Sequence, residues 1–518
     1  MQDLAAMLQR EGDIARSLER VSGLTVYPAS VVFSRGDLLF LGRQRSLRQL
    51  GILTAGPGVA AFQVSVRPVR LGGSPRLAGA ALTLALGDLS HANAVALRAR
   101  VPYTAPIRVG LAKSAGLGDR LGTATPGHIR ALRHSQGIVP VLAQQSIREM
   151  ERTQRSPQQV MDDATWGVFQ EGWREGYGAD ADHLKTEQDI DACVAAGFVM
   201  YTFDPRDQVD NDAETDPVST LAAKFAALPW ERLETTPAAT RVAYQGNTWP
   251  LGDGVALALT EEQLLRAACK YGAALAHLVG LYRHLVGAIG GRSFELEVSV
   301  DETDTPTRPE EHFYIASELR RLGVEWVSLA PRSVGRFEKG VDYIGDLAEF
   351  EATFARHVAV AKALGPYKLS IHSGSDKFSI YPIAARLAGD LVHLKTAGTS
   401  YLEALRAVAQ MDPALFREIY QFALEHYETD RRTYHVSAEL AKAPSPAALA
   451  DADLPSVLDQ FDARQALHVT FGTALTERRP DGATLFRDRL YAVLDRHEEA
   501  HYRALETHIL RHLQPFSD

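Results

Sequence analysis

Several segments of the chain end in side chains that could move protons or bind a divalent metal ion. YGADADHLKT contains Asp182 and His183, FELEVSVDE contains Glu297, and YKLSIHSGSDK contains His372. Imidazole nitrogens and carboxylate oxygens are suitable ligands for divalent transition metals, and carboxylates that bind no metal can act as general acids or bases. This mixture of residue types is typical of metal-assisted chemistry on a sugar.

Polar and apolar side chains alternate in FELEVSVDE. One face would carry Glu295, Glu297, Ser299 and Asp301. Side chains of a strand alternate between its two faces, and helices cover the outside of a parallel barrel, so this polar face would point into the barrel. A strand with one face in solvent shows the same alternation, and that interpretation stays open.

Asp182 and His183 are adjacent, so a regular strand would point them to opposite faces. Both can serve one site only if the strand bends at its end. The segment LVHLKTAG repeats the pattern of polar residues at a strand end with His393 and Lys395.

Charged turns near the predicted strands supply further candidates. GLGDRLG at 116–122 lacks the glycine spacing and the lysine of a nucleotide-binding loop, so we exclude nucleotide binding there. An ordinary turn or a substrate-contacting loop remains possible. The candidate substrate-binding residues are Asp119, Arg120, Arg332, Asp376, Lys377, His393 and Lys395.

Short apolar runs alternate with helix patterns from about residue 105 onward. The runs are 108–112, 138–143, 177–184, 198–204, 294–300, 324–330, 367–373 and 390–396. One helix pattern between them starts at Thr186, with Asp189 in the capping-box position. Eight such units predict an α/β fold, a (β/α)8 TIM-type barrel. An open doubly wound sheet is the weaker alternative.

Three regions follow from this pattern. We expect an accessory N-terminal region at 1–104, which opens with an amphipathic helix pattern, and the barrel at 105–400. A long insertion interrupts the barrel at 205–293, and a C-terminal helical extension at 401–518 packs on it.

Composition limits the class of partner. The 518 residues carry a net charge of −9, which argues against nucleic acid and against a polybasic membrane patch. Cys193 and Cys269 are the only cysteines, so we expect neither a disulfide framework nor a cysteine zinc site, and a cytoplasmic location. The start of the chain lacks a signal-peptide pattern and no segment is apolar enough to span a membrane. A small-molecule partner is expected, and the oligomeric state stays open.

A series of longer blocks resembles the tagaturonate/fructuronate epimerase family, from roughly residue 105 to the C-terminus. The blocks are GLGDRLGTATPGHI, YGADADHLKTEQDI, FELEVSVDETDTPT, SLAPRSVGRFEKGVDYIGD, KLSIHSGSDKFSIYP, HLKTAGTSYLEALR, HVSAELAKAP and LHVTFGTAL.

This resemblance implies a metal-dependent isomerase of carbohydrate metabolism that interconverts D-tagaturonate and D-fructuronate, or fructose and tagatose in some members. It implies Asp182 as proton acceptor and Glu297 as proton donor. His183, Glu338 and His372 would bind the metal, with His393 as the first replacement for Glu338. The donor types suit Zn, Mn, Ni, Co or Fe and do not select among them.

The inverted carbon lies β to the ketone, so deprotonation next to a carbonyl cannot invert it. We therefore expect retro-aldol cleavage and re-addition, with the metal as Lewis acid. Transient oxidation would need a nicotinamide, for which the sequence has no fingerprint. A metal-dependent sugar aldolase and a non-catalytic sugar-binding barrel are the alternative functions. An anionic uronate would need local positive charge, for which Arg120, Arg332 and Lys377 are candidates.

Overall fold

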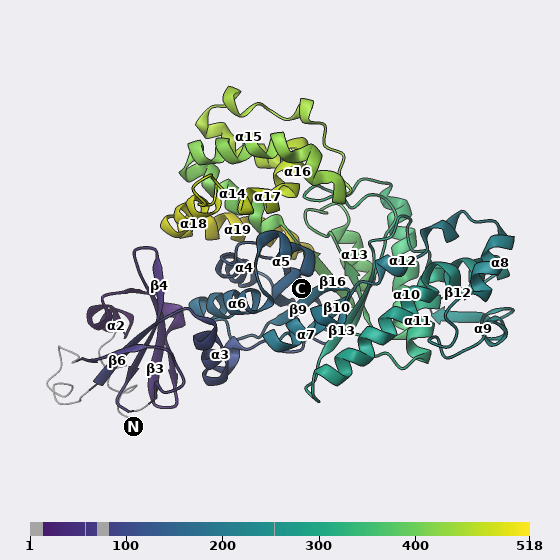
Figure 1. The fold of residues 1–518 in the computed structure, drawn as a ribbon, viewed down its shortest axis with the longest axis horizontal. Helices are drawn as coiled ribbons and strands as arrows, with labels where there is room; N and C mark the ends of the chain where they lie inside the picture. The colour runs from purple at the N-terminus through teal and green to yellow at the C-terminus, as the bar shows by residue number, and fades with distance from the viewer. Residues whose placement is uncertain (1–13, 57, 70–81, 253) are drawn as a thin grey trace.

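A closed parallel β-barrel forms the centre of the molecule in the computed structural model, which describes residues 14–56, 58–69, 82–252 and 254–518 (Figure 1). Its strands are β7 (Ser114–Leu117), β8 (Val139–Ser146), β9 (Gly178–Leu184), β10 (Met200–Phe203), β13 (Glu295–Val300), β14 (Ser328–Pro331), β15 (Lys368–Ile371) and β16 (Val392–Thr396). Each strand pairs in parallel with its neighbour in the chain, and β16 pairs with β7 to close the barrel. The predicted (β/α)8 barrel is confirmed, and the open doubly wound sheet is excluded.

Seven of the eight predicted apolar runs overlap a barrel strand, and the first does not. The run at 108–112 precedes β7 (Ser114–Leu117), whose residues are smaller and less apolar. A Cβ on Gly116 would lie 3.2 Å from Cγ of Gln144, so the space beside this strand is already filled. The prediction from hydrophobic runs therefore placed the first strand too early in the chain, because close packing inside the barrel requires small residues in β7.

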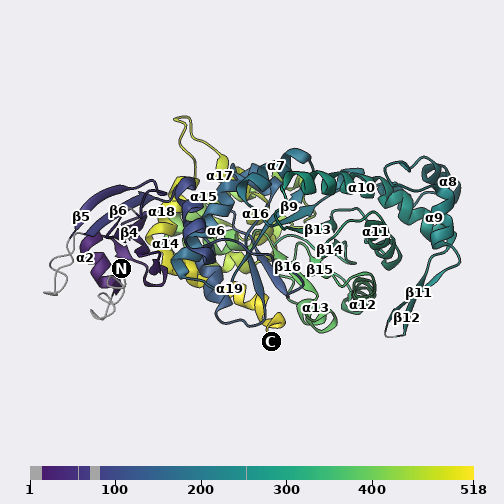
Figure 2. The same ribbon diagram turned by 90° about the horizontal axis from the view of Figure 1, so that it is seen from below.

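Helices surround the barrel and follow the predicted alternation (Figure 2). They are α4 (Thr125–Leu132), α5 (Ile147–Thr153), α6 (Pro157–Glu171), α7 (Glu187–Ala196), α11 (Pro309–Arg321), α12 (Leu347–Leu364) and α13 (Tyr381–Ala388). The predicted capping box of α7 is present, since Thr186 and Asp189 each accept a backbone N–H from the other residue. Gly197 ends this helix in the left-handed conformation, with φ 90°.

The N-terminal part of the chain forms an antiparallel sheet beside the barrel. Its elements are α2 (Ile14–Ser22), β1 (Thr25–Val26), β2 (Val32–Ser34), β3 (Asp37–Gln44), β4 (Leu47–Thr54), β5 (Ser65–Val69), β6 (Leu82–Asp88) and α3 (His91–Arg100). Residues 1–13, where part of the amphipathic helix pattern falls, lie outside the described residues. Trp166 and Phe169 of α6 share one apolar cluster with this sheet, which ties it to the barrel.

The insertion between β10 and β13 extends away from the barrel as an arm (Figure 1). It contains α8 (Val218–Ala226), α9 (Pro237–Tyr244), the hairpin β11 (Thr248–Gly252) and β12 (Val255–Ala258), and α10 (Glu261–Ala288). Among the described residues, no helix combines the length and hydrophobicity needed to cross a membrane.

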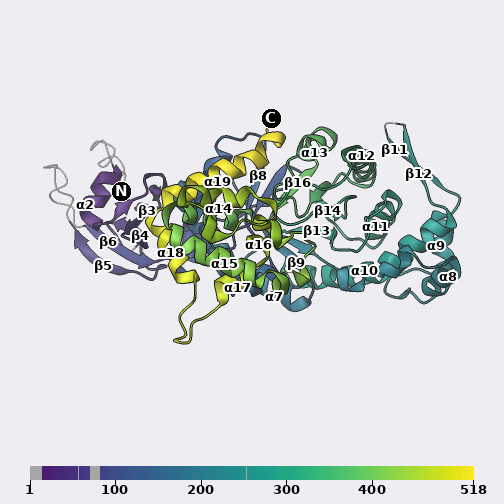
Figure 3. The same ribbon diagram turned by 90° about the horizontal axis from the view of Figure 1, so that it is seen from above.

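The C-terminal helices gather on one side of the barrel (Figure 3). They are α14 (Thr399–Met411), α15 (Pro413–Asp430), α16 (Phe461–Val469), α17 (Phe471–Thr476), α18 (Arg487–Arg496) and α19 (Glu498–Leu513). α19 packs against α4 and α14, and α17 packs against α5. The connection between α15 and α16 passes over the carboxyl ends of the strands, where residues 433–437 line a cavity.

Candidate active site

Asp182 and His183 both face the carboxyl end of the barrel because β9 bends between them. His183 has φ 56°, in the left-handed region, and the register between β9 and β10 shifts at this point. Nε2 of His183 consequently lies 3.7 Å from Oδ1 of Asp182, while its Nδ1 lies 3.1 Å from Oδ2 of Asp204. A carboxylate on one ring nitrogen orients the other toward a ligand, as in many metal sites.

Glu297 lies at the centre of β13, fully buried among charged partners. Its Oε1 is 2.7 Å from Nζ of Lys395 and 2.6 Å from Nε2 of His372, and its Oε2 accepts a hydrogen bond from Ser328. Burial alone would raise the pKa of Glu297, but Lys395 and His372 hold it well below its ordinary range. The predicted inward polar face of this strand is therefore present, with Glu297 ionised.

Lys395 connects three carboxylates inside the barrel. Its Nζ lies 2.7 Å from Asp180, from Asp182 and from Glu297, and it donates a hydrogen bond to Thr202. Burial raises the pKa of Asp180 to about 6 despite the nearby lysine, whereas His183 and Lys395 overcome burial and lower the pKa of Asp182 to about 2. Lys395 and neighbouring histidines thus favour the ionised form of both Asp182 and Glu297.

Five side chains, which we call the mouth cluster, meet at the carboxyl end of the barrel: Asp182, His183, Glu297, Asp301 and His372. Ligand atoms of His183, Asp301 and His372 all lie within 4.8 Å of one another, as do those of Asp182, Glu297 and His372. The two imidazole rings lie edge to face, with centroids 5.0 Å apart. Two imidazoles and several carboxylates in this space fit a divalent transition metal.

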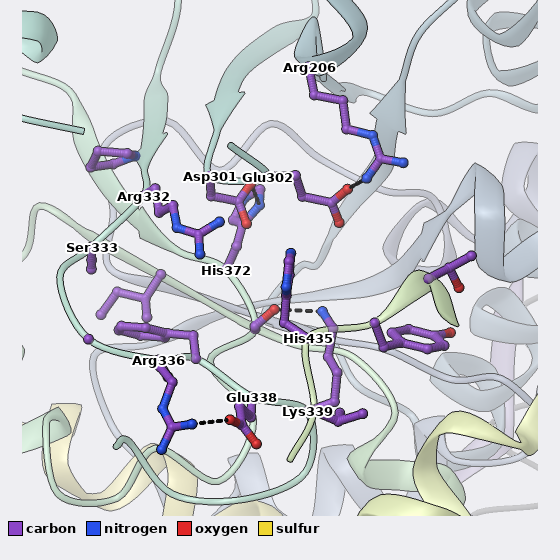
Figure 4. Close-up of a pocket in the computed structure, with 18 of the residues that line it drawn as sticks. Arg206, Asp301, Glu302, Arg332, Ser333, Arg336, Glu338, Lys339, His372 and His435 are labelled. Carbon is purple, nitrogen blue, oxygen red and sulfur yellow. Dashed lines mark hydrogen bonds and ion pairs between the residues drawn. The ribbon is translucent and has the colours of Figure 1, made fainter. Parts of the chain in front are cut away.

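A cavity of about 350 Å³ opens beside the mouth cluster (Figure 4). Asp301 and His372 line it, together with Arg332 and Lys339 from the loop after β14. A narrow recess of about 30 Å³, which Asp301, His372 and Lys339 also line, continues to Asp182, His183 and Lys395. The volume is in the range of small-molecule sites, and the position matches the active-site end of (β/α)8 enzymes.

Glu338 lines the cavity but does not meet the two histidines. Its Oε2 accepts hydrogen bonds from Ser437 and from Nε2 of Gln465, and its Oε1 lies 3.3 Å from Arg336. Among the described residues, Glu338 belongs to none of the groups whose ligand atoms lie close enough to share an ion. In this conformation Asp301, which was not among the predicted ligands, lies closer to His183 and His372 than Glu338 does.

The loop candidates divide between the recess and the surrounding structure. Arg120 lines the recess, but its guanidinium pairs with Glu149 at 2.6 Å and stacks on Phe471. Asp119 accepts three backbone N–H groups of its own loop, from Leu121, Gly122 and Ala124. Both side chains therefore organise the loop after β7, and neither is free toward the larger cavity.

Lys377 and His393 are buried away from the larger cavity. Nζ of Lys377 donates to the carbonyls of Glu338, Val341 and Ser375, and burial lowers its pKa to about 7. His393 shares a hydrogen bond with Ser114 of the adjacent strand β7, and burial lowers the pKa of His393 to about 3. Neither residue lines the cavity or the recess.

Asp376 belongs to a second group, which we call the interface cluster: Asp376, Arg464, His508 and His512. Asp376 lies 2.6 Å from His508 and 3.0 Å from Arg464, and its backbone N–H donates to Nε2 of His512. This group joins the turn after β15 to the C-terminal helices α16 and α19. Asp376 therefore contacts the extension and does not line the cavity.

Several residues of the site were not chosen from the sequence. Asp301 was detectable, because it continues the polar alternation of Glu295, Glu297 and Ser299. Asp204 follows β10 directly and Glu302 lies two residues after β13, so their positions in the sequence place both at the carboxyl end of the barrel. His435 lines the cavity from the C-terminal extension, and only its place in the block HVSAELAKAP could have suggested it.

Known tagaturonate epimerases match this chain over nearly its whole length. A family model for tagaturonate epimerase matches residues 27–516. A tagaturonate/fructuronate epimerase of Thermotoga maritima is 45% identical over 426 residues, which cover 82% of this chain and 85% of that protein. The native crystal structure of the fructuronate-tagaturonate epimerase of Cohnella laeviribosi superposes with a TM-score of 0.88 at 39% identity, covering 97% of this chain and 99% of the other. A glycerol complex of the same enzyme gives a TM-score of 0.88 at 38% identity, covering 98% and 99%. The chain therefore belongs to the tagaturonate epimerase family.

Proposed function

We propose that this protein is a metal-dependent epimerase that interconverts D-tagaturonate and D-fructuronate. The observation that carries the proposal is the convergence of the mouth cluster on a cavity of about 350 Å³ in a chain of this family. Asp182 and Glu297 supply two carboxylates for proton transfer, and His183 and His372 supply nitrogen donors beside them.

The position of the inverted carbon dictates the chemistry. This carbon is β to the ketone, so its hydrogen is not acidified by the carbonyl group. Cleavage of the bond between the α and β carbons avoids the problem, because the β carbon becomes a planar aldehyde. Re-addition to the opposite face of the aldehyde then gives the epimer.

Asp182 and Glu297 have complementary roles in this route. Ionised Asp182 accepts the proton of the β-hydroxyl as the carbon–carbon bond breaks, and Glu297 donates a proton to the oxygen formed on re-addition. Lys395 lies 2.7 Å from both carboxylates, so its ammonium can give a proton to Glu297 as it takes one from Asp182, and it stays protonated after the exchange. That transfer protonates Glu297 for its step and returns Asp182 to its ionised form.

The donors of the mouth cluster fit a divalent ion, and we propose His183 and His372 as two of its ligands. Such an ion would supply Lewis-acid stabilisation of the negative charge that develops on the substrate oxygens. The third ligand is Asp301, which already lies beside both imidazoles, or Glu338, which requires its loop to shift. Asp301→Asn and Glu338→Gln proteins distinguish the two, since only loss of the true ligand weakens metal binding strongly.

A product assay tests the function. The protein is incubated with tagaturonate or with fructose, with and without added Mn²⁺ or Zn²⁺, and the sugars are identified by NMR. Metal-dependent appearance of fructuronate supports the proposal. Accumulation of free three-carbon fragments would instead indicate an aldolase, and bound sugar without turnover would indicate a non-catalytic barrel.

Glu297→Gln provides the matched test of the proton-transfer roles. We expect the variant to bind metal and to epimerise far more slowly, by roughly 100-fold or more. Asp162→Asn is the control, because Asp162 is a buried carboxylate that pairs with Arg98 between α3 and α6, away from the cavity. A Glu297→Gln protein with wild-type turnover would remove Glu297 from the mechanism.

A further inference from the structure

The cavity beside the mouth cluster is lined by five lysine and arginine side chains, of which three form ion pairs and a fourth donates a hydrogen bond. They are Arg148, Arg206, Arg332, Arg336 and Lys339. Arg148 and Arg206 pair with Glu302, Arg336 pairs with Glu338, and Lys339 donates to Ser373. Within the described part of the chain, the guanidinium of Arg332 has neither a hydrogen bond nor an ion pair.

The main chain fixes the position of Arg332. The residue follows the last residue of β14, and its N–H donates to Oγ1 of Thr307 at 3.0 Å while its carbonyl accepts from the N–H of Thr307 at 2.9 Å. The side chain is half-buried and extends into the cavity on the same side as Asp301 and His372 (Figure 4). Arg332 is therefore held rigidly at its backbone and unpaired at its tip.

A half-buried guanidinium without a partner has lost part of its hydration and has gained no hydrogen bond or ion pair in exchange. Burial lowers the pKa of Arg332, which reflects the loss of water around it. Asp301, whose charge acts on Arg332, is already engaged by His372 at 3.0 Å and by Ser299. A planar guanidinium in this state offers two parallel N–H groups to an incoming carboxylate.

We propose that Arg332 binds the carboxylate of the substrate and selects a six-carbon keto acid over a neutral ketohexose. This inference rests on the proposed function, since it assigns one end of the proposed substrate. The sugar would then lie between Arg332 and the mouth cluster, with its ketone end toward His183 and His372.

The proposed chemistry gives this contact a second role. Numbered from the hydroxymethyl end, the bond that breaks joins carbons 3 and 4; its electron pair stays on the fragment of carbons 1–3, and the proton of the hydroxyl on carbon 4 goes to Asp182. The carboxylate remains on the aldehyde fragment of carbons 4–6. Arg332 therefore retains the fragment that must turn before the bond re-forms, and it limits escape of that fragment from the cavity.

Substitution of Arg332 tests the inference in two ways. We expect Arg332→Met to lower kcat/KM for tagaturonate by about 10- to 100-fold and to leave any turnover of fructose within about twofold. Arg332→Lys keeps the charge without the fork and should fall between the two proteins. Arg386→Met is the control, because Arg386 is an exposed arginine of α13 that pairs with Glu351 outside the cavity.

Binding of two non-reacting ligands separates this inference from the proposed function. D-gluconate and sorbitol are matched six-carbon polyols that differ in the terminal carboxylate. By calorimetry on metal-loaded protein, we expect wild type to bind gluconate at least about tenfold more tightly than sorbitol, and Arg332→Met to lose that difference. Preference for gluconate that survives in Arg332→Met, or equal loss of both ligands, overturns the assignment. Wild type that binds gluconate through Arg332 but does not epimerise tagaturonate contradicts the proposed function alone.

Discussion

The mouth cluster and the interface cluster contain the same residue types and differ in what surrounds them. Each includes a group of carboxylate and imidazole ligand atoms within 4.8 Å of one another. In the interface cluster, His512 accepts the N–H of Asp376 at Nε2 and shares its Nδ1 with the carbonyl of His508. In the mouth cluster, the imidazoles of His183 and His372 border the cavity and its recess.

The same side-chain types therefore stabilise the fold in the interface cluster and are placed for chemistry in the mouth cluster. Arg464 supplies a permanent counter-charge to Asp376, so the interface cluster is complete without a ligand. In the mouth cluster, Lys395 gathers the carboxylates, and the partners of the two imidazoles are carboxylates that could bind the same ion. Proximity of ligand types is therefore insufficient to identify a site, and a cavity beside the donor atoms is the more useful criterion.

The largest expected effect is on turnover. Asp182→Asn removes the proposed base while Lys395 keeps Asp180 and Glu297 as partners, so we expect kcat to fall by roughly 100- to 10,000-fold. Asp376→Asn, the matched change in the interface cluster, should lower kcat by less than tenfold in protein that remains folded. Steady-state kinetics of both proteins make the comparison, and equal losses would end the distinction between the clusters.

Metal content should follow the same division. We expect His372→Ala to reduce bound divalent metal by about tenfold or more, because it removes a proposed ligand. His512→Ala should retain the wild-type amount, since both nitrogens of His512 are used inside the protein. Elemental analysis after dialysis against trace metal measures both. Retained metal in His372→Ala would assign the ion elsewhere.

The free energy of unfolding should depend strongly on the interface cluster. Asp376→Asn leaves the buried Arg464 with only its longer contact to Glu403, at 3.6 Å, so we expect the free energy of unfolding to fall by about 3 kcal/mol or more. Arg356→Met, which removes an exposed ion pair with Glu310, should change it by less than about 1 kcal/mol. Urea denaturation at neutral pH supplies the values. An unchanged midpoint for Asp376→Asn would show that the interface cluster is not structural.

The smallest effect is the pH dependence of the contact between α4 and α19. Burial lowers the pKa of His128 and of His501 to about 4, below the value of about 6.5 in an unfolded chain. Unfolding therefore takes up protons between about pH 6.5 and pH 4, and stability that is present above pH 6.5 is lost as the pH falls through this window. We expect about 1 kcal/mol of loss for each histidine at pH 5.5. His501→Gln should reduce the loss between pH 7.5 and 5.5 in urea titrations; an identical pH profile would contradict this cause.

The barrel itself was predictable, because its signals are periodic. Alternation in FELEVSVDE placed Glu297 inside, and Thr186 with Asp189 marked the start of α7. The first strand was misplaced because its small residues carry little hydrophobic signal. Position after a strand was also informative, since Arg332 does line the cavity.

The direction of each loop side chain was not predictable, because distant partners decide it. Lys377 turns to backbone carbonyls of the loop after β14, and Asp376 is drawn to helices about 90 to 130 residues later in the chain. Asp182 and His183 share one site only through the left-handed backbone at His183. His435 lines the cavity from a segment that does not directly follow a strand, so its position in the sequence gave no signal.

Metal dependence is measured as the rate of tagaturonate epimerisation, followed by NMR, while metal-free protein is titrated with Mn²⁺ or Zn²⁺. We expect negligible turnover after chelation and full recovery at about one equivalent of metal per chain, with no recovery in His372→Ala. Full turnover in thoroughly chelated protein, or recovery in His372→Ala equal to wild type, would contradict a metal-dependent epimerase at the mouth cluster.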